Sequence, residues 1–108
     1  MLTGERRDGP ASLMLVESVL VAPHLREQLR EIVRFYCEPE HRRQGHGSAL
    51  LGAVCLEADQ ARRVLLLHVQ PEEDIPAEDL EALYARFGFA RLQDEPLLMV
   101  RNFAGATH

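Results

Sequence analysis

The stretch His41–Leu51, "HRRQGHGSALL", lies between a strand-like segment and the clearest helical pattern in the chain. It places adjacent arginines, two glycines and a serine directly before an apolar run. Free backbone N–H groups and the helix dipole favour an anion at a helix N-terminus. Glycines let a bulky anion approach the backbone, and arginine binds phosphate through two parallel hydrogen bonds. The stretch therefore predicts a phosphate or pyrophosphate site.

Two common phosphate-binding loops do not fit this stretch. The Walker loop needs a lysine after its second glycine, and all twelve Lys and Arg residues of this chain are arginines. The dinucleotide-binding loop needs three spaced glycines, and Gly52 comes too late in the sequence to be the third. The pattern that remains is Arg-x-x-Gly-x-Gly, at Arg42, Gly45 and Gly47.

The segments before and within this stretch alternate between extended and helical patterns. The valine-rich segment Leu13–Ala22 predicts a strand. A second strand is expected from about Glu31 to Glu38, ended by Pro39. The overlapping segment "HLREQLREIV" also has apolar residues at helical spacing, so a turn or a short helical piece would precede that strand. A helix is expected from about His46 to Ala61.

The C-terminal half continues the alternation. The apolar run "RVLLLHV" predicts a strand buried on both faces. After the polar loop "QPEEDIPAED", a helix is expected over about Ala77–Phe87, with Gly88 as its C-terminal glycine. The segment "PLLMVRN" predicts a last strand. This order indicates an α/β fold in which the first helix is a right-handed crossover between parallel strands.

Length and composition limit the possible classes of protein. A chain of 108 residues forms one domain, which we expect over residues 11–108, after a flexible tail at 1–10. The net charge of −5 argues against non-specific nucleic-acid binding. Cys37 and Cys55 fit neither a disulfide framework nor a metal site. The apolar segment Leu13–Ala22 is too short to span a bilayer and does not fit a signal peptide, so we expect a cytoplasmic protein without a membrane partner.

Two longer segments carry a family resemblance. "FYCEPEHRRQGHGSALL" at Phe35–Leu51 and "LYARFGFARL" at Leu83–Leu92 resemble the two hallmarks of the GNAT superfamily of N-acetyltransferases. The resemblance covers about residues 31–102. It implies a minimal GNAT-like fold, with a mixed central sheet and two main helices. It also implies acetyl-CoA as the cofactor, and transfer of the acetyl group to a primary amine.

The resemblance also implies a cofactor site. In the family, two neighbouring strands splay apart and the pantetheine arm lies between them; here these would be about Val33–Glu38 and Val64–Val69. The strand residues Phe35, Tyr36 and Cys37 would line that opening. The pyrophosphate would be held by the loop residues Arg42, Arg43, Gln44, Gly45, His46, Gly47 and Ser48. His46 could equally face solvent.

The expected catalytic residues are Tyr84, Glu38 and His68. The family's equivalent of Tyr84 can protonate the departing thiolate, although Tyr84 also fits a plain core position on its helix. Many members carry a glutamate base where this chain has Arg34, so Glu38 and His68 are the substitutes. A strand histidine satisfied by a neighbour is an open alternative for His68. Arg34 could instead bind an acidic part of the substrate.

The acceptor is the least determined part. Only about thirty residues precede the splayed strand, so the acceptor site is expected to be reduced, open or shared. The segments Arg43–Ser48 and Pro71–Leu80 resemble short phage-type acetyltransferases, which modify a lysine on a large macromolecule. The acceptor is therefore expected to be a protein lysine or a small-molecule amine. A non-catalytic relative acting through protein contact, a structural domain without a ligand, and a homodimer with paired sheet edges remain alternatives.

Overall fold

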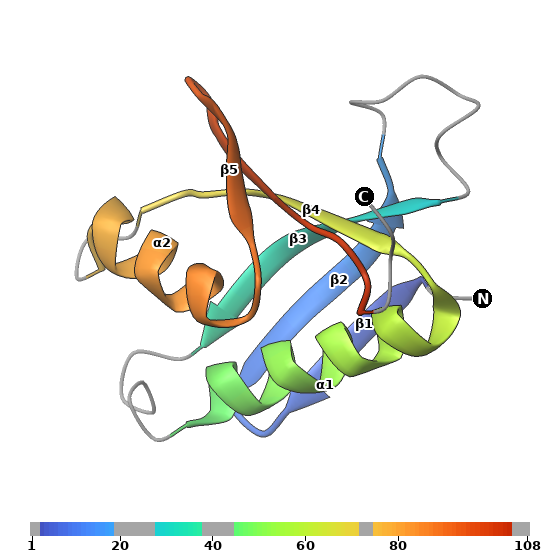
Figure 1. The fold of residues 1–108 in the computed structure, drawn as a ribbon. Coiled ribbons are helices and arrows are strands. Elements are labelled where there is room, and N and C mark those ends of the chain that lie inside the picture. Colours follow the sequence, from blue (N-terminus) through green and yellow to red (C-terminus); the bar gives the residue numbers. More distant parts are fainter. Residues whose placement is uncertain (1–2, 19–27, 38–44, 72–74, 105–108) are drawn as a thin grey trace.

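The computed structural model describes residues 3–18, 28–37, 45–71 and 75–104. These residues form an α/β fold with one mixed sheet of six strands, in the order β1-β2-β3-β4-β6-β5, and two helices (Figure 1). The strands are β1 (Gly4–Asp8), β2 (Ala11–Glu17), β3 (Leu29–Cys37), β4 (Val64–His68), β5 (Ala90–Asp94) and β6 (Leu97–Arg101). The helices are α1 (His46–Ala61) and α2 (Ala77–Arg86).

The sheet contains one parallel pair, β3 with β4, and the other neighbours are antiparallel. Helix α1 connects β3 to β4, which confirms the predicted crossover between parallel strands. The parallel ladder is short, since it joins only Leu29–Ile32 to Val64–Leu67. Beyond Ile32 and Leu67 the two strands have no described pairing with each other, although β3 continues to Cys37.

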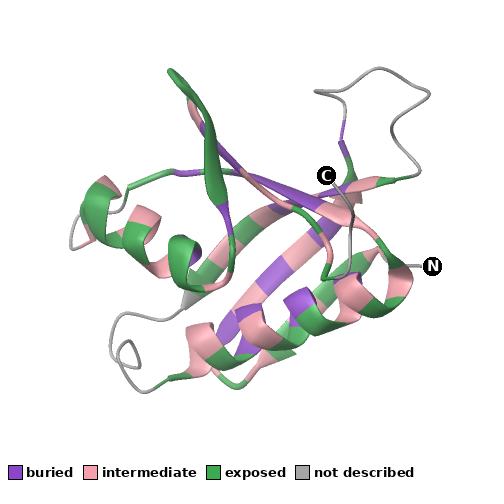
Figure 2. Cartoon of the chain, viewed as in Figure 1, coloured by how far each residue is buried: buried purple, intermediate pink, exposed green. Residues whose placement is uncertain are grey.

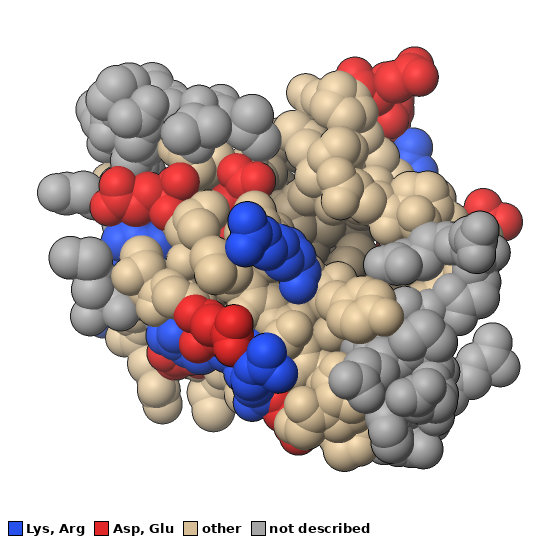
Figure 3. All heavy atoms as spheres, turned by 180° about the vertical axis from the view of Figure 1, so that it is seen from behind, with Lys and Arg blue, Asp and Glu red and all other residues tan. Residues whose placement is uncertain are grey.

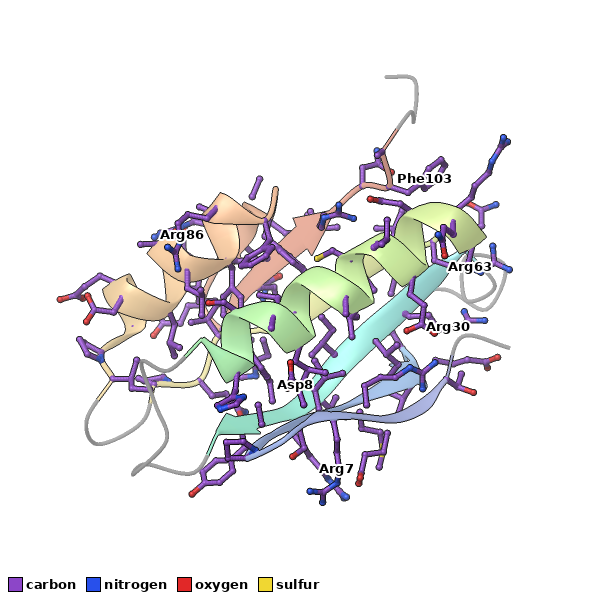
Figure 4. The ribbon with its side chains drawn as sticks, turned by 90° about the horizontal axis from the view of Figure 1, so that it is seen from below. Arg7, Asp8, Arg30, Arg63, Arg86 and Phe103 are labelled. Atoms are coloured by element: carbon purple, nitrogen blue, oxygen red, sulfur yellow. The ribbon has the colours of Figure 1, made fainter. Side chains whose placement is uncertain are left out.

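One face of the sheet is covered by the helices, as the view in Figure 4 shows. Alternate residues of the central strands face this core, and α1 contributes one apolar stripe to it. The core residues of the strands are Ala11, Leu13, Leu15, Ile32, Leu65, Leu67 and Met99, and those of α1 are Leu50, Leu51, Val54, Cys55 and Ala58. In Figure 2 the buried positions lie on α1, on β2 behind it, and along β4 and β6. The predicted burial of the β4 run is confirmed, because Leu65, Leu66 and Leu67 are all buried.

Side-chain ion pairs hold α1 at both sides of the sheet. Arg6 of β1 binds both carboxylate oxygens of Glu57, at 3.0 and 2.8 Å. Arg101 of β6 binds both oxygens of Asp59, and its Nε donates to the carbonyl of Phe87 at 2.7 Å. Arg101 therefore connects β6 to the last turn of α1 and to the end of α2.

The structure corrects several expected boundaries. Residues 1–10 were expected to be a flexible tail, but Gly4–Asp8 pair with β2 as an edge strand. The charged sequence of β1 gives no apolar alternation, and the strand is held by its backbone ladder. The first predicted strand begins at Ala11 rather than Leu13, and residues 19–22 lie outside the described part. The strand expected from Glu31 begins at Leu29, and α2 ends at Arg86.

The last part of the sheet is a hairpin. Directly after Gly88 and Phe89 the chain forms β5. It pairs antiparallel with β6, the strand predicted from "PLLMVRN". All five side chains of β5 are exposed, so no hydrophobic pattern separated β5 from the loop before β6. Within the described residues no helix is long and apolar enough to cross a membrane.

Candidate acetyl-CoA site

A β-bulge in β3 sets the direction of the side chains near the end of its pairing with β4. Two steps along β2, from Ser12 to Met14, match three steps along β3, from Tyr36 to Val33. The extra residue lies at Arg34, whose φ of 55° is in the left-handed region. Because of the extra residue, Phe35 packs against the same core as Ile32, three positions earlier. Regular alternation would have placed these two side chains on opposite faces.

Phe35 lies where α1 and α2 meet the part of β3 that does not pair with β4. Its ring centroid lies 6.2 Å from that of Tyr84 on α2, with a tilt of 46°. A Cβ added at Gly47, in the first turn of α1, would lie 3.6 Å from the Phe35 ring. This is an ordinary van der Waals distance, so the Cβ of an alanine would fit there. The start of α1 thus lies close to the ring of Phe35 on β3.

The start of α1 has the features of an anion site. Gly45 is the N-cap residue, with φ of 90°, and a Cβ built there meets no atom of the described residues within 4 Å. The first intrahelical hydrogen bond runs from the Ala49 N–H to the Gly45 carbonyl, at 2.9 Å. No side chain caps the helix among the described residues, and no acidic residue lies in its first turn. The N–H groups before Ala49 are thus at a positive helix end with open space beside Gly45.

His46 has a contact that the sequence did not suggest. Its Nδ1 lies 3.5 Å from Oδ1 of Asp8, at the end of β1. A Cβ on the neighbouring Gly9 would lie 3.4 Å from the same nitrogen. Figure 4 shows Asp8 on the side of β1 that faces α1, whereas Arg7 points away from the helix. His46 therefore packs against the β1–β2 turn, whereas Gly47, the next residue of α1, lies beside the ring of Phe35.

Tyr84 is buried, with 6% of its surface exposed. Its ring contacts Phe35 on one side and Phe89 on the other, where the ring centroids are 5.9 Å apart. The chain returns here because Gly88, with φ of 94°, ends α2 and the Phe89 N–H donates to the Tyr84 carbonyl. Tyr84, the predicted proton donor, thus lies against Phe35, one of the residues predicted to line the cofactor opening.

The remaining predicted residues lie at different distances from this cluster. His68 is exposed and ends β4, one position after the last residue paired with β3; its Nδ1 lies 3.4 Å from Nε2 of Gln70. Tyr36 is 42% exposed, on the part of β3 that has lost β4. Four predicted site residues lie outside the described part of the chain: Glu38, Arg42, Arg43 and Gln44. The side chain of Cys37 lies outside it as well. No group of His, Cys, Asp and Glu in the described part of the chain could hold a metal ion.

Residues 6–91 match the family model of the acetyltransferase (GNAT) domain. The chain belongs to the GNAT family. The match covers most of the chain and includes the segment Phe35–Leu51 and all but the last residue of Leu83–Leu92. No curated protein matches the sequence of this GNAT domain.

Solved structures agree with the fold of this GNAT domain. A Klebsiella pneumoniae protein assigned as an acyl-CoA N-acyltransferase superposes with a TM-score of 0.62 and 25% identity, over 86% of this chain and 63% of that one. The ribosomal-protein-S18-alanine N-acetyltransferase of Escherichia coli gives 0.66 and 18%, over 92% and 64%. The anti-CRISPR protein AcrVA5 gives 0.67 and 22%, over 90% and 97%. The chain thus spans under two thirds of the first two proteins and nearly all of the third.

Proposed function

We propose that this chain is an acetyl-CoA-dependent N-acetyltransferase whose acceptor is a primary amine, with a protein lysine as the expected acceptor class. The observation that carries the proposal is the end of the β3–β4 ladder at Ile32 and Leu67, beside the start of α1. An extended ligand can hydrogen-bond there to the side of β3 that faces β4, because beyond Ile32 the described part of β3 pairs only with β2. Its phosphates would meet the helix N-terminus next to Gly45.

The described residues fit the two ends of such a ligand. Open space beside Gly45 and the uncapped first turn of α1 suit the pyrophosphate. The part of β3 that does not pair with β4, from Val33 onward, suits the amide-containing arm. When bound, acetyl-CoA supplies the acetyl group as a reactive thioester. Arg42, Arg43 and Gln44 are proposed to add charge and hydrogen bonds to the phosphates, as the sequence pattern predicts.

Two side chains are proposed to move protons. The Tyr84 hydroxyl would donate its proton to the departing sulfur atom, because Tyr84 lies against Phe35 in the part of β3 that does not pair with β4. His68 would accept a proton from the acceptor ammonium, directly or through water, because it is exposed at the end of β4. Glu38 is the alternative base. The Tyr84 residue as a whole is largely removed from bulk water, since 6% of its surface is exposed.

The acceptor class is supported by the exposure of the residues at the end of the β3–β4 ladder. Tyr36 of β3 and His68 of β4 are both exposed there. An exposed site suits an amine on a large molecule better than an enclosed small one. The lysine therefore remains the first acceptor to test.

Calorimetry of acetyl-CoA binding tests the proposal directly. We expect micromolar binding by the wild type and at least tenfold weaker binding by Gly45→Glu, which places bulk and negative charge beside the uncapped helix end. Ala53→Glu is the matched control, because it adds the same side chain at an exposed position two turns along α1. Adding Arg42→Ala to Gly45→Glu tests the predicted phosphate arginine. A folded wild type that does not bind acetyl-CoA would overturn the proposal.

Turnover separates the catalytic proposal from the non-catalytic alternative. Release of the free thiol of CoA is measured with acetyl-CoA and a lysine-containing peptide mixture. Binding with turnover supports the enzyme. Binding without turnover on any amine would instead favour a GNAT domain that acts through protein contact.

A further inference from the structure

Arg34 combines two backbone features that a structural surface arginine does not need. It is the extra residue of the β3 bulge, and its backbone is left-handed, with φ of 55°. Such a conformation costs a residue with a side chain about 1 kcal/mol or more. Glycine or asparagine would adopt it at lower cost. Strain of this kind is typical of functional positions, where the side chain is required for its chemistry.

The guanidinium of Arg34 is available. Its side chain is exposed, and in the described part of the chain it makes no hydrogen bond or ion pair. Other arginines of the sheet are paired with carboxylates, as with Arg6 and Glu57, Arg91 and Glu81, and Arg101 and Asp59. Figure 3 shows the side of the molecule turned away from Figure 1, where arginine and acidic side chains lie among uncharged residues.

Arg34 also lies just beyond the end of the β3–β4 ladder, beside the proposed cofactor site. It is two positions beyond Ile32, the last residue of β3 that pairs with β4. His68 follows Leu67, the last paired residue of β4, and is also exposed. The two residues therefore stand on the two strands that border the interrupted ladder. An amine that reaches the thioester through this interruption passes close to a fixed positive charge.

We propose that Arg34 selects acceptors that carry a carboxylate beside the reactive amine, and that it rejects amines surrounded by positive charge. This inference rests on the proposed acetyltransferase function. A carboxylate next to the amine can form a bidentate pair with the guanidinium, which positions the amine. A polyamine or a lysine among basic residues is repelled by the same charge, so selection has an attractive and a repulsive part. The chemistry is shared by an acidic-flanked protein lysine and by a free amino acid.

The test compares matched acceptors. One pair of nine-residue peptides has a central lysine flanked by glutamates or by glutamines. A second pair is free lysine and cadaverine, which differ by the carboxylate; spermidine is the cationic probe. We expect kcat/KM to favour the carboxylate member of at least one pair about 3- to 10-fold, as for an exposed ion pair. The pair that shows the preference identifies the source of the carboxylate.

Two variants of Arg34 connect the preference to this residue. Arg34→Gly keeps the left-handed backbone and removes the charge, so the preference should disappear. Arg34→Glu should reverse it and improve turnover of spermidine. Arg62 is the matched control, because it is an exposed arginine with φ of 56° at the opposite end of α1. Arg62→Gly and Arg62→Glu should leave the preference unchanged.

A binding measurement gives a second readout. The fluorescence anisotropy of both labelled peptides is measured with the wild type and with Arg34→Glu in the presence of CoA. Equal affinity and equal turnover for both members of each pair, or a preference that survives Arg34→Glu, would overturn the inference. Absence of binding and turnover with every probe would overturn it as well. In each case, acetyl-CoA binding by the same samples shows whether the proposed function itself fails.

Discussion

Arg101 of β6 binds both carboxylate oxygens of Asp59 on α1, with Nη1 and Nη2 at 2.8 and 3.1 Å from Oδ1 and Oδ2. Both side chains are mostly buried. Asp59 also accepts a hydrogen bond from the Ala104 N–H, at 2.8 Å. Hydrogen bonding from Arg101 is the largest influence on Asp59 and lowers the pKa of its carboxyl group, while burial opposes the change.

The Arg101–Asp59 pair should contribute to the free energy of unfolding by an amount that depends on pH. Because the pKa of Asp59 is lower in the folded chain, its stabilisation is complete above the ordinary aspartate pKa of about 4 and is lost as the pH falls through the lower folded value. Asp59→Asn should reduce the free energy of unfolding by about 1–2 kcal/mol at pH 7, and by less near pH 3. Urea unfolding at the two pH values measures the difference.

Asp94→Asn is the control for this prediction. Asp94 pairs with Arg91 at 2.8 Å, but both side chains are exposed. Its replacement should change the free energy of unfolding by about 0.5 kcal/mol or less. If Asp59→Asn and Asp94→Asn lost the same stability at pH 7, the buried Arg101–Asp59 pair would contribute no more to stability than the exposed Arg91–Asp94 pair.

Tyr84→Phe should separate a catalytic hydroxyl from a packing ring. Phenylalanine keeps the ring contacts with Phe35 and Phe89 and removes only the oxygen. We expect kcat to fall about 100-fold or more, with acetyl-CoA affinity and the melting temperature nearly unchanged. Steady-state kinetics and calorimetry on the same sample provide the check. A variant that lost stability but kept kcat would identify Tyr84 as a core residue.

Arg62 offers a route to higher stability. It is the C-cap of α1, with φ of 56° and ψ of 54°, and its N–H donates to the carbonyls of Ala58 and Asp59. Glycine adopts this conformation without strain, although it gains freedom in the unfolded chain. Arg62→Gly should therefore raise the free energy of unfolding by about 0.5–1 kcal/mol. Arg62→Val, which is branched at Cβ, should lower it; equal melting temperatures for all three proteins would contradict the argument.

Cys55 should be unreactive in the folded protein. Burial raises the pKa of its thiol to about 11, while the charge of Arg101 opposes the change. At pH 8 only about one thiol in a thousand is then ionised, and the side chain is 4% exposed. In a Cys37→Ser variant, a disulfide reagent such as DTNB should modify Cys55 only after unfolding in urea. Rapid modification under native conditions would show that α1 opens.

The central part of the fold could be predicted because local and tertiary signals agree there. Helix α1 has the predicted bounds, His46–Ala61, since its apolar stripe and the glycines before it indicate the same element. The β4 run is buried on both sides, as a continuous apolar segment predicts. The family itself follows from the loop and from the Tyr-x-x-x-Gly-Phe segment around Tyr84.

The outer strands could not be predicted in the same way. β1 is charged and β5 is fully exposed, so each is held mainly by the backbone ladder to one neighbour. The bulge at Arg34 was also missed, because a left-handed residue is signalled by glycine or asparagine and an arginine gives no such sign. That bulge decides that Phe35 faces Tyr84. The homodimer, the acceptor and the base remain predictions.

The interruption between β3 and β4 gives the sheet an internal edge in addition to its two outer edges. Exposed outer edges are the usual starting points of aggregation, because a strand of another molecule can pair with them. The internal edge begins at Ile32 and Leu67, where β3 and β4 are already joined, so a full strand from a second copy cannot add without breaking that ladder. Self-association is thereby discouraged at the place where the protein keeps its strand backbone open.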